Sequence, residues 1–229
     1  EVSREYKVFV AGPKISSSMQ AEFNKRNIEH IHLPIVNISI TPFRDISYFM
    51  KLVAIIIKLR PKIILSYTLK PNLYGSLAAR IFRVDCYSMF TGLGSYFEKK
   101  EGIFNRVSLK LLKFILRTSL KRNKKVIFYN SNNMETFMIS SLCSPSQAEI
   151  VEGSGVDINY YKSKRFRDFT NIDNIVFLCS SRILKDKGIM EYLEAAKEIK
   201  SKNKGVDFRL MGWFQESSNS VSKEIIEKY

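Results

Sequence analysis

Short apolar runs alternate with longer amphipathic stretches along almost the whole chain. The run Lys62-Ile-Ile-Leu-Ser-Tyr67 is nearly continuous in apolar residues, which is typical of a strand buried on both faces of a parallel sheet. Further strands are expected at 6–11, 28–35, 84–90, 125–130 and 148–152, separated by helices at 18–24, 46–59, 73–83, 103–121 and 132–141. This alternation predicts a parallel α/β sheet, because parallel strands need a crossover between them.

A second α/β unit is expected after the polar, aromatic and basic stretch 158–174, which has no clear period and is interpreted as a linker. Its pattern predicts a strand at 175–179, a helix at 188–202, a strand at 206–211 and a final helix that is still running near Tyr229. The expected domains are therefore 1–157 and 175–229. Two strands are few for a parallel sheet, and the first domain opens on a strand, so both domains are expected to be incomplete.

Helix starts are expected at polar residues that can cap them. Ser18 is placed before the helix through Asn24, and Asp45 before the apolar helix 46–59. That apolar helix contains Lys51 and Lys58 and falls short of the roughly 20 residues of a bilayer span. We expect a soluble or peripheral protein, not an integral one.

The composition is strongly basic and contains few cysteines. Lys and Arg number 37 against 22 Asp and Glu, a net charge of +15, which favours an anionic partner. Genomic base composition is an alternative source of the surplus. The 3 cysteines are widely spaced, which argues against a disulfide framework or a zinc site and for a reducing, cytoplasmic location.

The segment 66–80 places a strand end, a Lys-Pro-Asn turn and a helix start in succession. Ligands of open α/β sheets bind beyond the carboxyl ends of the strands, so Lys70 and Asn72 are cleft candidates. Free amides at the helix start favour an anion there. The alternative is that the turn is ordinary and Gly75 only permits close packing.

A second candidate segment, 90–97, also follows a strand. Its two glycines, Gly92 and Gly94, let the backbone approach a ligand closely, and Thr91 beside them is a further cleft candidate. A plain loop explains the pattern as well.

The helix 103–121 is expected to be cationic and amphipathic. Its apolar positions Phe104, Val107, Leu111 and Ile115 are expected to pack on the sheet. Its opposite face carries basic residues that are candidates for contact with anionic lipid: Arg106, Lys110, Lys113, Arg117 and Lys121. The alternative is a solvated charged face.

The loop 180–189 directs fixed positive charges and a helix start toward one region. Arg182 and Lys187 are interpreted as candidates for binding a diphosphate, with a merely charged loop as the alternative.

Taken together, four stretches resemble the family 4 glycosyltransferases of the GT-B fold, and among them bacterial enzymes that extend undecaprenyl-diphosphate-linked sugars. The matching stretches are Tyr67-Thr-Leu-Lys-Pro-Asn-Leu-Tyr-Gly75, Thr91-Gly-Leu-Gly94, Gly153-Ser-Gly-Val-Asp157 and Ser181-Arg-Ile-Leu-Lys-Asp-Lys-Gly188. Their order and spacing match the family across nearly the whole chain.

The resemblance implies an acceptor-binding Rossmann-like lobe at 1–157 and the start of a nucleotide-sugar-binding lobe at 175–229. It implies a UDP-sugar donor, a lipid-linked saccharide acceptor, retention of anomeric configuration and the synthesis of O-antigen, capsule or another surface glycan. Arg182 and Lys187 would bind the donor diphosphate, and Gly155 and Asp157 would lie at the cleft. No cofactor and no metal are expected, and the protein would work on the inner face of the cytoplasmic membrane.

Departures from the family pattern leave parts of the site unassigned. Many relatives carry a His where this chain has Thr91-Gly92, so no catalytic residue is assigned. The first strand–helix loop of the family and its later Glu-containing donor motif are not found, so weak donor binding is expected.

Three other interpretations stay open. A GT-B-fold sugar-nucleotide epimerase needs acid and base residues that the chain does not offer convincingly. A noncatalytic basic protein would bind membrane or nucleic acid, but the interleaved aromatic residues of a single-strand groove are missing, and no nucleic-acid partner is expected. An inactive gene fragment is the third.

Overall fold

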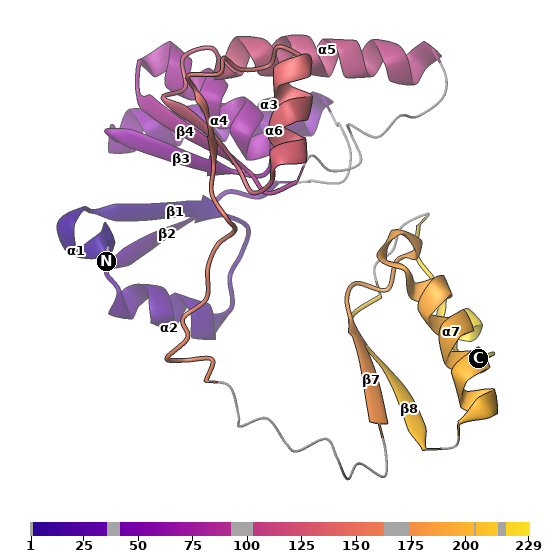
Figure 1. Cartoon of the computed structure of the whole chain (residues 1–229). Helices are drawn as coiled ribbons and strands as arrows, with labels where there is room; N and C mark the ends of the chain where they lie inside the picture. Colours follow the sequence, from indigo (N-terminus) through magenta and orange to yellow (C-terminus); the bar gives the residue numbers. More distant parts are fainter. Residues whose placement is uncertain (1, 36–41, 93–102, 163–174, 204, 215–218) are drawn as a thin grey trace. The chain divides into compact units, whose positions relative to one another are not determined.

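The computed structural model describes residues 2–35, 42–92, 103–162, 175–203, 205–214 and 219–229 (Figure 1). The chain forms two compact units, Glu1–Asp157 and Ile158–Tyr229. The division falls at the end of the first domain that the sequence predicts.

From Val8 onward the first unit alternates strands and helices in the order that the apolar pattern predicts. The short helix Val2–Glu5 before the first strand was not expected. It contains α1 (Val2–Glu5), β1 (Val8–Gly12), α2 (Ser17–Lys25), β2 (Ile28–His32), α3 (Pro42–Leu59), β3 (Ile63–Tyr67), α4 (Leu69–Phe82), β4 (Asp85–Phe90), α5 (Ile103–Leu120), β5 (Lys125–Phe128), α6 (Ser131–Ile139) and β6 (Ala148–Ile150).

All the strand pairs of this unit are parallel, as predicted, but they form two sheets rather than one. A four-stranded sheet has the order β3-β4-β5-β6, and β1 pairs with β2 in a separate sheet. In the larger sheet Tyr67 pairs with Met89, and Phe128 pairs with both Phe90 and Ile150. The carboxyl ends of its four strands therefore lie along one edge.

The core of the first unit lies between the four-stranded sheet and the helices α4, α5 and α6, which cover one face of it (Figure 1). At its centre the rings of Phe90 and Phe128 stack at 5.9 Å, and Phe137 contacts them at 4.7 and 5.0 Å. All three side chains are fully buried. Burial of one such side chain contributes about 1.5–3 kcal/mol to stability, so this cluster holds α6 against the sheet.

A buried polar network joins α4 to β4 and to Asn123, which follows α5. Ser76 Oγ and Ser88 Oγ lie 2.9 Å apart, and Asn123 Nδ2 donates to both, at 2.9 and 2.7 Å.

A Cβ atom at Gly75 would overlap Ser66 Oγ. Gly75 therefore permits close packing of α4 on β3. This agrees with the interpretation in the sequence analysis that Gly75 has a packing role.

Two expected helix caps are wrong by a few residues. Helix α2 is capped by Ser16, whose Oγ accepts from the amide of Met19 at 3.2 Å, rather than by Ser18. Helix α3 begins at Pro42, so Asp45 lies within its first turn and does not cap it. Several neighbouring polar residues can cap a helix, and the sequence alone does not distinguish between them.

Helix α5 buries a different face from the expected one. Its buried apolar positions are Leu112, Leu116 and Leu120, each one turn from the next. Val107 and Leu111 are 60% and 58% exposed, Ile115 is half-buried, and the side chain of Phe104 lies outside the described residues. The error corresponds to about one residue, or ~100° around the helix axis, because leucines occupy both sides of this helix.

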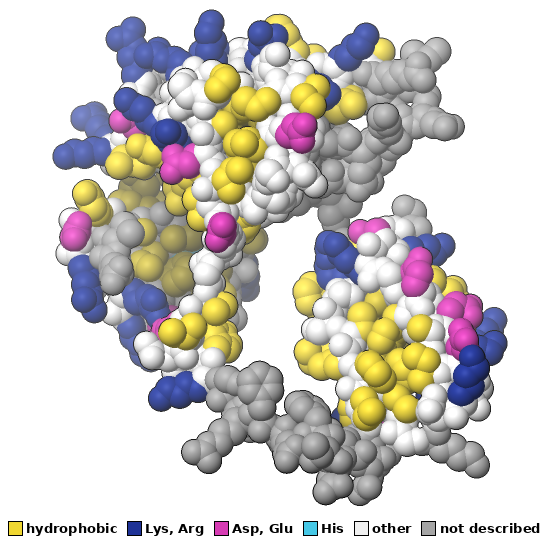
Figure 2. Space-filling view, in the orientation of Figure 1, with side chains coloured by type: hydrophobic (Ala, Val, Ile, Leu, Met, Phe, Trp, Pro, Cys, Tyr) yellow, Lys and Arg dark blue, Asp and Glu magenta, His cyan; other side chains and the backbone are white. Residues whose placement is uncertain are grey.

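The second unit contains β7 (Ile175–Ser180), the 3-10 turn η2 (Lys185–Lys187), α7 (Ile189–Lys202), β8 (Val206–Met211) and α8 (Lys223–Ile226). Strands β7 and β8 are parallel, with Ile175 opposite Val206. Helix α8 ends at Ile226, so the final helix is shorter than expected. Hydrophobic side chains of β7, among them Phe177 and Leu178, are exposed on this unit (Figure 2).

No helix in the described parts of the chain is both long enough and apolar enough to span a bilayer.

Candidate functional site

The carboxyl edge of the four-stranded sheet gathers the candidate residues of the first unit. Helix α4 follows β3, the Thr91-Gly92 segment follows β4, α6 follows β5, and the segment 153–157 follows β6. Because the four strands are parallel and in register, these segments all begin at the same edge, which is where open α/β sheets bind ligands.

Helix α4 begins at Leu69, four residues before the expected start at 73. The Lys-Pro-Asn sequence therefore forms the first turn of the helix and not a preceding turn. Pro71 is compatible with this position because the first amides of a helix have no partner within the helix.

Lys70 is held in a buried ion pair. Its Nζ lies 2.7 Å from the Asp45 carboxylate, and the two side chains are only 5% and 8% exposed. The pair joins the first turns of α3 and α4. The Lys70 charge is thus directed at a protein carboxylate, which favours the structural interpretation of this residue over the anion-binding one.

Asn72 ties the first turn of α4 to the end of β4. Its Nδ2 donates to the carbonyl oxygen of Met89 at 2.8 Å. Its Oδ1 is buried and, in the described part of the chain, accepts no hydrogen bond. Leaving such an acceptor unpaired costs roughly 1–3 kcal/mol, so this atom marks the carboxyl edge as a place where a polar partner would be stabilising.

Thr68 has a backbone conformation that a β-branched residue rarely adopts. Its φ and ψ are 72° and 166°, and its amide donates to Met89 O at 3.3 Å. Such conformations cost of the order of 1–3 kcal/mol and tend to occur at functional sites. Neither the strain at Thr68 nor the partner of Lys70 was predicted, because both depend on contacts between distant residues.

The remaining candidates of the first unit follow β4 and β6. Thr91 is half-buried and Gly92 is exposed, whereas Gly94 lies outside the described residues. Gly155 has a φ of +67°, a left-handed conformation that favours glycine, and Asp157 is exposed close by in the sequence.

The candidate diphosphate loop of the second unit runs from Ser181 to Gly188. Two hydrogen bonds to the end of β8 and the residues after it fix its backbone: the Ser181 amide donates to Met211 O at 3.0 Å, and the Ile183 amide to Trp213 O at 3.2 Å. Ile183 and Leu184 are buried beneath it. This anchoring leaves the charged residues on either side to face solvent.

Arg182 and Lys187, the two predicted diphosphate ligands, are both exposed. Lys187 Nζ lies 4.0 Å from the Asp186 carboxylate, a weak contact for exposed groups. Gly188, with a φ of +72°, turns the chain into α7. The loop therefore places two cations before the amino end of a 14-residue helix, whose free amides and dipole attract anions.

The basic residues of α5 lie on its exposed side. Figure 2 shows Lys and Arg side chains gathered along the upper edge of the first unit, over α5. Lys110, Arg117 and Lys121 are exposed, whereas Lys113 is half-buried and donates to Ser140 Oγ at 3.1 Å. The side chain of Arg106 lies outside the described residues. The exposed apolar residues of α5 lie beside these basic residues on the helix surface: Val107, Leu111 and Phe114.

Within the described ranges, no three His, Cys, Asp or Glu side chains gather where they could hold a metal ion.

The fold resembles several solved structures. HepE from Anabaena, solved with UDP and glucose, superimposes with a TM-score of 0.60 at 14% identity, covering 93% of this chain and 64% of HepE. A glycosyltransferase from Rickettsia africae gives a TM-score of 0.57 at 14% identity, covering 98% of this chain and 62% of its own. A UDP-N-acetylglucosamine 2-epimerase from Listeria monocytogenes gives 0.54 at 14% identity, covering 97% of this chain and 56% of its own. The architecture is therefore α/β of the GT-B type, as predicted.

The sequence defines the family more narrowly than the fold does. Residues 2–130, more than half of the chain, match the family described as glycosyl transferase 4-like. The chain belongs to this family, which confirms the resemblance seen in its motifs.

A curated relative comes from Campylobacter jejuni. It is an N,N'-diacetylbacillosaminyl-diphospho-undecaprenol alpha-1,3-N-acetylgalactosaminyltransferase, 26% identical over 202 residues, which cover 82% of this chain and 51% of the relative. The chain thus spans about half the length of the relative that it matches.

Proposed function

We propose that this protein transfers a hexosyl or N-acetylhexosaminyl group from a UDP-sugar to a saccharide linked to undecaprenyl diphosphate, with retention of configuration. The name of the Campylobacter relative supports the acceptor class and an N-acetylhexosamine donor. The complexes of HepE with UDP and glucose support a UDP-sugar. The product would belong to a surface polysaccharide or glycan.

The observation that carries the proposal is the anchored loop of the second unit in a chain of this family. Arg182 and Lys187 are both exposed in the loop that precedes α7, so we infer that both contact the diphosphate of a donor. In the reaction the bond between the sugar C1 and the β-phosphate oxygen breaks, and its electron pair goes to that oxygen. The acceptor hydroxyl oxygen forms the new bond to C1, and its proton passes to the phosphate oxygen of the leaving UDP.

Positive charge at the loop acts on the step in which charge develops. The leaving UDP gains negative charge as the bond to C1 breaks, and fixed cations stabilise this charge more strongly in the transition state than in the bound donor. Two side-chain cations and a helix amino end can supply this stabilisation without a metal ion. The loop would therefore increase the rate of transfer as well as the affinity for the donor.

A transfer assay tests the proposed reaction. The protein is incubated with an undecaprenyl-diphosphate-linked saccharide and UDP-N-acetylgalactosamine, UDP-N-acetylglucosamine or UDP-glucose, and the lipid product is identified by mass spectrometry. We expect one added sugar with at least one donor. Arg182→Gln should lower the rate by about 100-fold or more, as expected for loss of a group that stabilises a developing anion.

The matched control is Lys200→Gln. Lys200 is exposed in the last turn of the same helix, so its loss changes the net charge equally but leaves the loop intact. Its rate should stay within about twofold of the native one, since exposed charges far from the reacting atoms contribute little. Equal losses in the two variants, or no sugar transfer with any donor, would contradict the proposed function.

We further propose that α5 docks the protein on an anionic membrane, where a lipid-linked acceptor resides. Its exposed surface combines Val107, Leu111 and Phe114 with Lys110, Arg117 and Lys121. Each Lys or Arg near an anionic surface contributes about 1 kcal/mol. The apolar side chains add burial in the headgroup region. The location on the inner face of the cytoplasmic membrane belongs to this proposal.

Sedimentation with vesicles tests the membrane surface. We expect the protein to sediment with phosphatidylglycerol vesicles more than with phosphatidylcholine vesicles. The variant Lys110→Gln/Arg117→Gln/Lys121→Gln should stay in the supernatant, and Leu111→Ser/Phe114→Ser should sediment less than the native protein.

A triple control on another helix removes the same number of charges. Lys58→Gln/Arg60→Gln/Lys62→Gln neutralises three exposed cations at and after the end of α3. This control should sediment as the native protein does. If the control and the α5 variant are released equally, total charge and not α5 determines vesicle binding, and the membrane proposal is wrong.

A further inference from the structure

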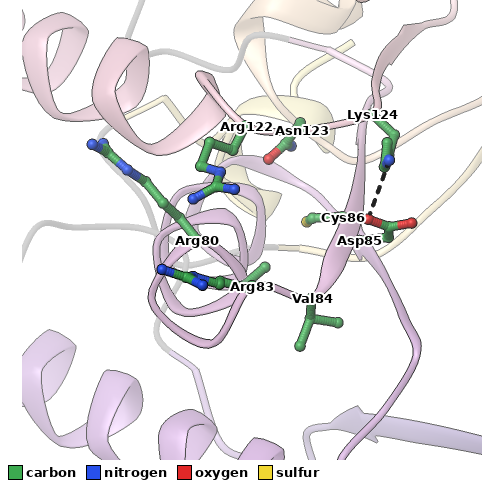
Figure 3. A pocket seen from close by; sticks show the side chains of 9 residues that line it. Arg80, Arg83, Val84, Asp85, Cys86, Arg122, Asn123 and Lys124 are labelled. Atoms are coloured by element: carbon green, nitrogen blue, oxygen red, sulfur yellow. Dashed lines mark ion pairs between the residues drawn. The ribbon is translucent and has the colours of Figure 1, made fainter.

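A basic pocket lies at the edge of the four-stranded sheet opposite the candidate site. It has a volume of about 180 Å³ and opens where β4 and β5 begin and where α4 and α5 end (Figure 3). Buried Cys86 and Asn123 line its inner side. None of the motifs that relate the chain to its family includes these residues.

Three arginines from different segments line this pocket. Arg80 lies on α4 and donates to Thr118 O at 2.7 Å, which fixes its guanidinium at the last turns of α5. Arg83 follows α4 in a left-handed conformation, with a φ of 56°. Arg122 follows α5. Figure 3 shows the three side chains on the same side of β4.

The positive charge around the pocket exceeds the negative charge that the protein supplies. Lys124 also lines it, 3.4 Å from the carboxylate of Asp85. Four cations against one carboxylate leave three positive charges. The carboxyl ends of α4 and α5 carry roughly −0.5 each, so about two positive charges stay uncompensated.

The two outer arginines carry this excess. Among the described residues, the side chains of Arg83 and Arg122 form no hydrogen bond and no ion pair, unlike those of Arg80 and Lys124. Capping of α5 explains the position of Arg80, but it does not explain why Arg83 and Arg122 share one cavity with it.

The inner side of the pocket adds no negative charge. Burial raises the pKa of the Cys86 thiol, so this group stays protonated at neutral pH. The side-chain amide of Asn123 is fixed by its bonds to Ser76 and Ser88. The surroundings are therefore neutral inside and cationic at the rim, which suits an anion.

We propose that this pocket binds the phosphoryl group of a phosphate ester. Guanidinium groups form paired hydrogen bonds with phosphate oxygens, and about two uncompensated positive charges match a phosphate monoester dianion. Sites for whole small molecules typically have volumes of about 300–1,000 Å³, so this one admits the phosphoryl group while the rest of the ligand stays outside. The ester is either a soluble metabolite or a lipid headgroup.

Titration with inorganic phosphate tests the site directly. The Nε–H signals of Arg83 and Arg122 in NMR spectra should shift and saturate. Calorimetry on Arg83→Gln/Arg122→Gln should show at least tenfold weaker phosphate binding.

The matched control is Arg60→Gln/Lys62→Gln, which removes two exposed cations outside the pocket. Arg60 also follows a helix in a left-handed conformation, with a φ of 46°, so it reproduces the backbone setting of Arg83. The control should bind phosphate within twofold of the native protein. Equal weakening in both double variants, or the absence of a saturable shift in the native protein, would overturn the proposal.

Vesicles identify the source of the phosphoryl group once phosphate binding is established. If a lipid headgroup is the ligand, Arg83→Gln/Arg122→Gln sediments less with phosphatidic acid vesicles than the control, and inorganic phosphate competes with the vesicles. If a soluble ester is the ligand, the two double variants sediment equally. In both cases phosphate affinity retained by Arg83→Gln/Arg122→Gln would overturn the site.

Discussion

Lys70 and Asp45 form a buried ion pair, with 2.7 Å between Lys70 Nζ and the Asp45 carboxylate. Asp45 lies in α3, which precedes β3, and Lys70 lies in α4, which follows β3. The pair fixes the first turn of α4 against that of α3. Lys70 lies between Thr68, whose backbone is strained, and Asn72, whose Oδ1 is unpaired among the described residues. The charge of Lys70 thus stabilises the carboxyl edge of the sheet from within.

Removing one member of this pair should destabilise the protein strongly. Lys70→Met leaves the Asp45 carboxylate buried without its cation, so the free energy of unfolding in urea should fall by about 3–5 kcal/mol. The double variant Asp45→Leu/Lys70→Met removes both charges and should recover most of that loss. If the double variant loses as much as the sum of the single ones, the two residues are not coupled.

The close approach of α4 to β3 predicts a specific rescue. A Cβ at Gly75 would overlap Ser66 Oγ, so Gly75→Ala should lower the free energy of unfolding by about 1–3 kcal/mol. In a Ser66→Ala background the overlap disappears, and Gly75→Ala should become neutral or stabilising, because alanine favours a helix by up to about 1 kcal/mol over glycine. A cost that is independent of Ser66 would mean that Gly75 serves another purpose.

The buried face of α5 can be tested residue by residue. Leu116 is fully buried and Leu111 is 58% exposed. Leu116→Ala should cost about 2–5 kcal/mol in chemical denaturation, whereas Leu111→Ala should cost less than about 0.5 kcal/mol. A larger loss of stability for Leu111→Ala than for Leu116→Ala would instead support the buried face that the sequence predicted.

Much of the fold follows from local pattern, and much of the site does not. Strands such as β4 and β8 lie within a residue of their expected positions, because each is a short apolar run between two longer helical segments. The prediction of the buried face of α5 was wrong because leucines occupy both sides of this helix. The Lys70–Asp45 pair joins residues 25 positions apart in sequence, and no local pattern indicates such a contact. The segment of Arg182 and Lys187 lies between β7 and α7, as its local pattern predicts, whereas its role in binding a diphosphate stays a prediction.

Because Tyr48 is buried, we expect the protein to lose stability at high pH. Burial raises its pKa to about 12 in the folded protein, against 10.0 for an exposed tyrosine. Its contribution is complete below pH 10 and decreases as the pH rises toward 12, because the unfolded chain loses the proton first. From pH 9 to pH 11, the free energy of unfolding of the native protein should fall by about 1–2 kcal/mol more than that of Tyr48→Phe. Parallel curves for the two proteins would show that the hydroxyl is solvated.

The loop of the second unit is the basis of the proposed function, and calorimetric titration with UDP tests it most directly. The account predicts saturable binding that becomes at least tenfold weaker in Arg182→Gln. Lys200→Gln and the pocket variant Arg83→Gln/Arg122→Gln should keep the native affinity, which separates this site from the proposed phosphoryl pocket. Unchanged UDP affinity in Arg182→Gln would contradict the diphosphate role of the loop.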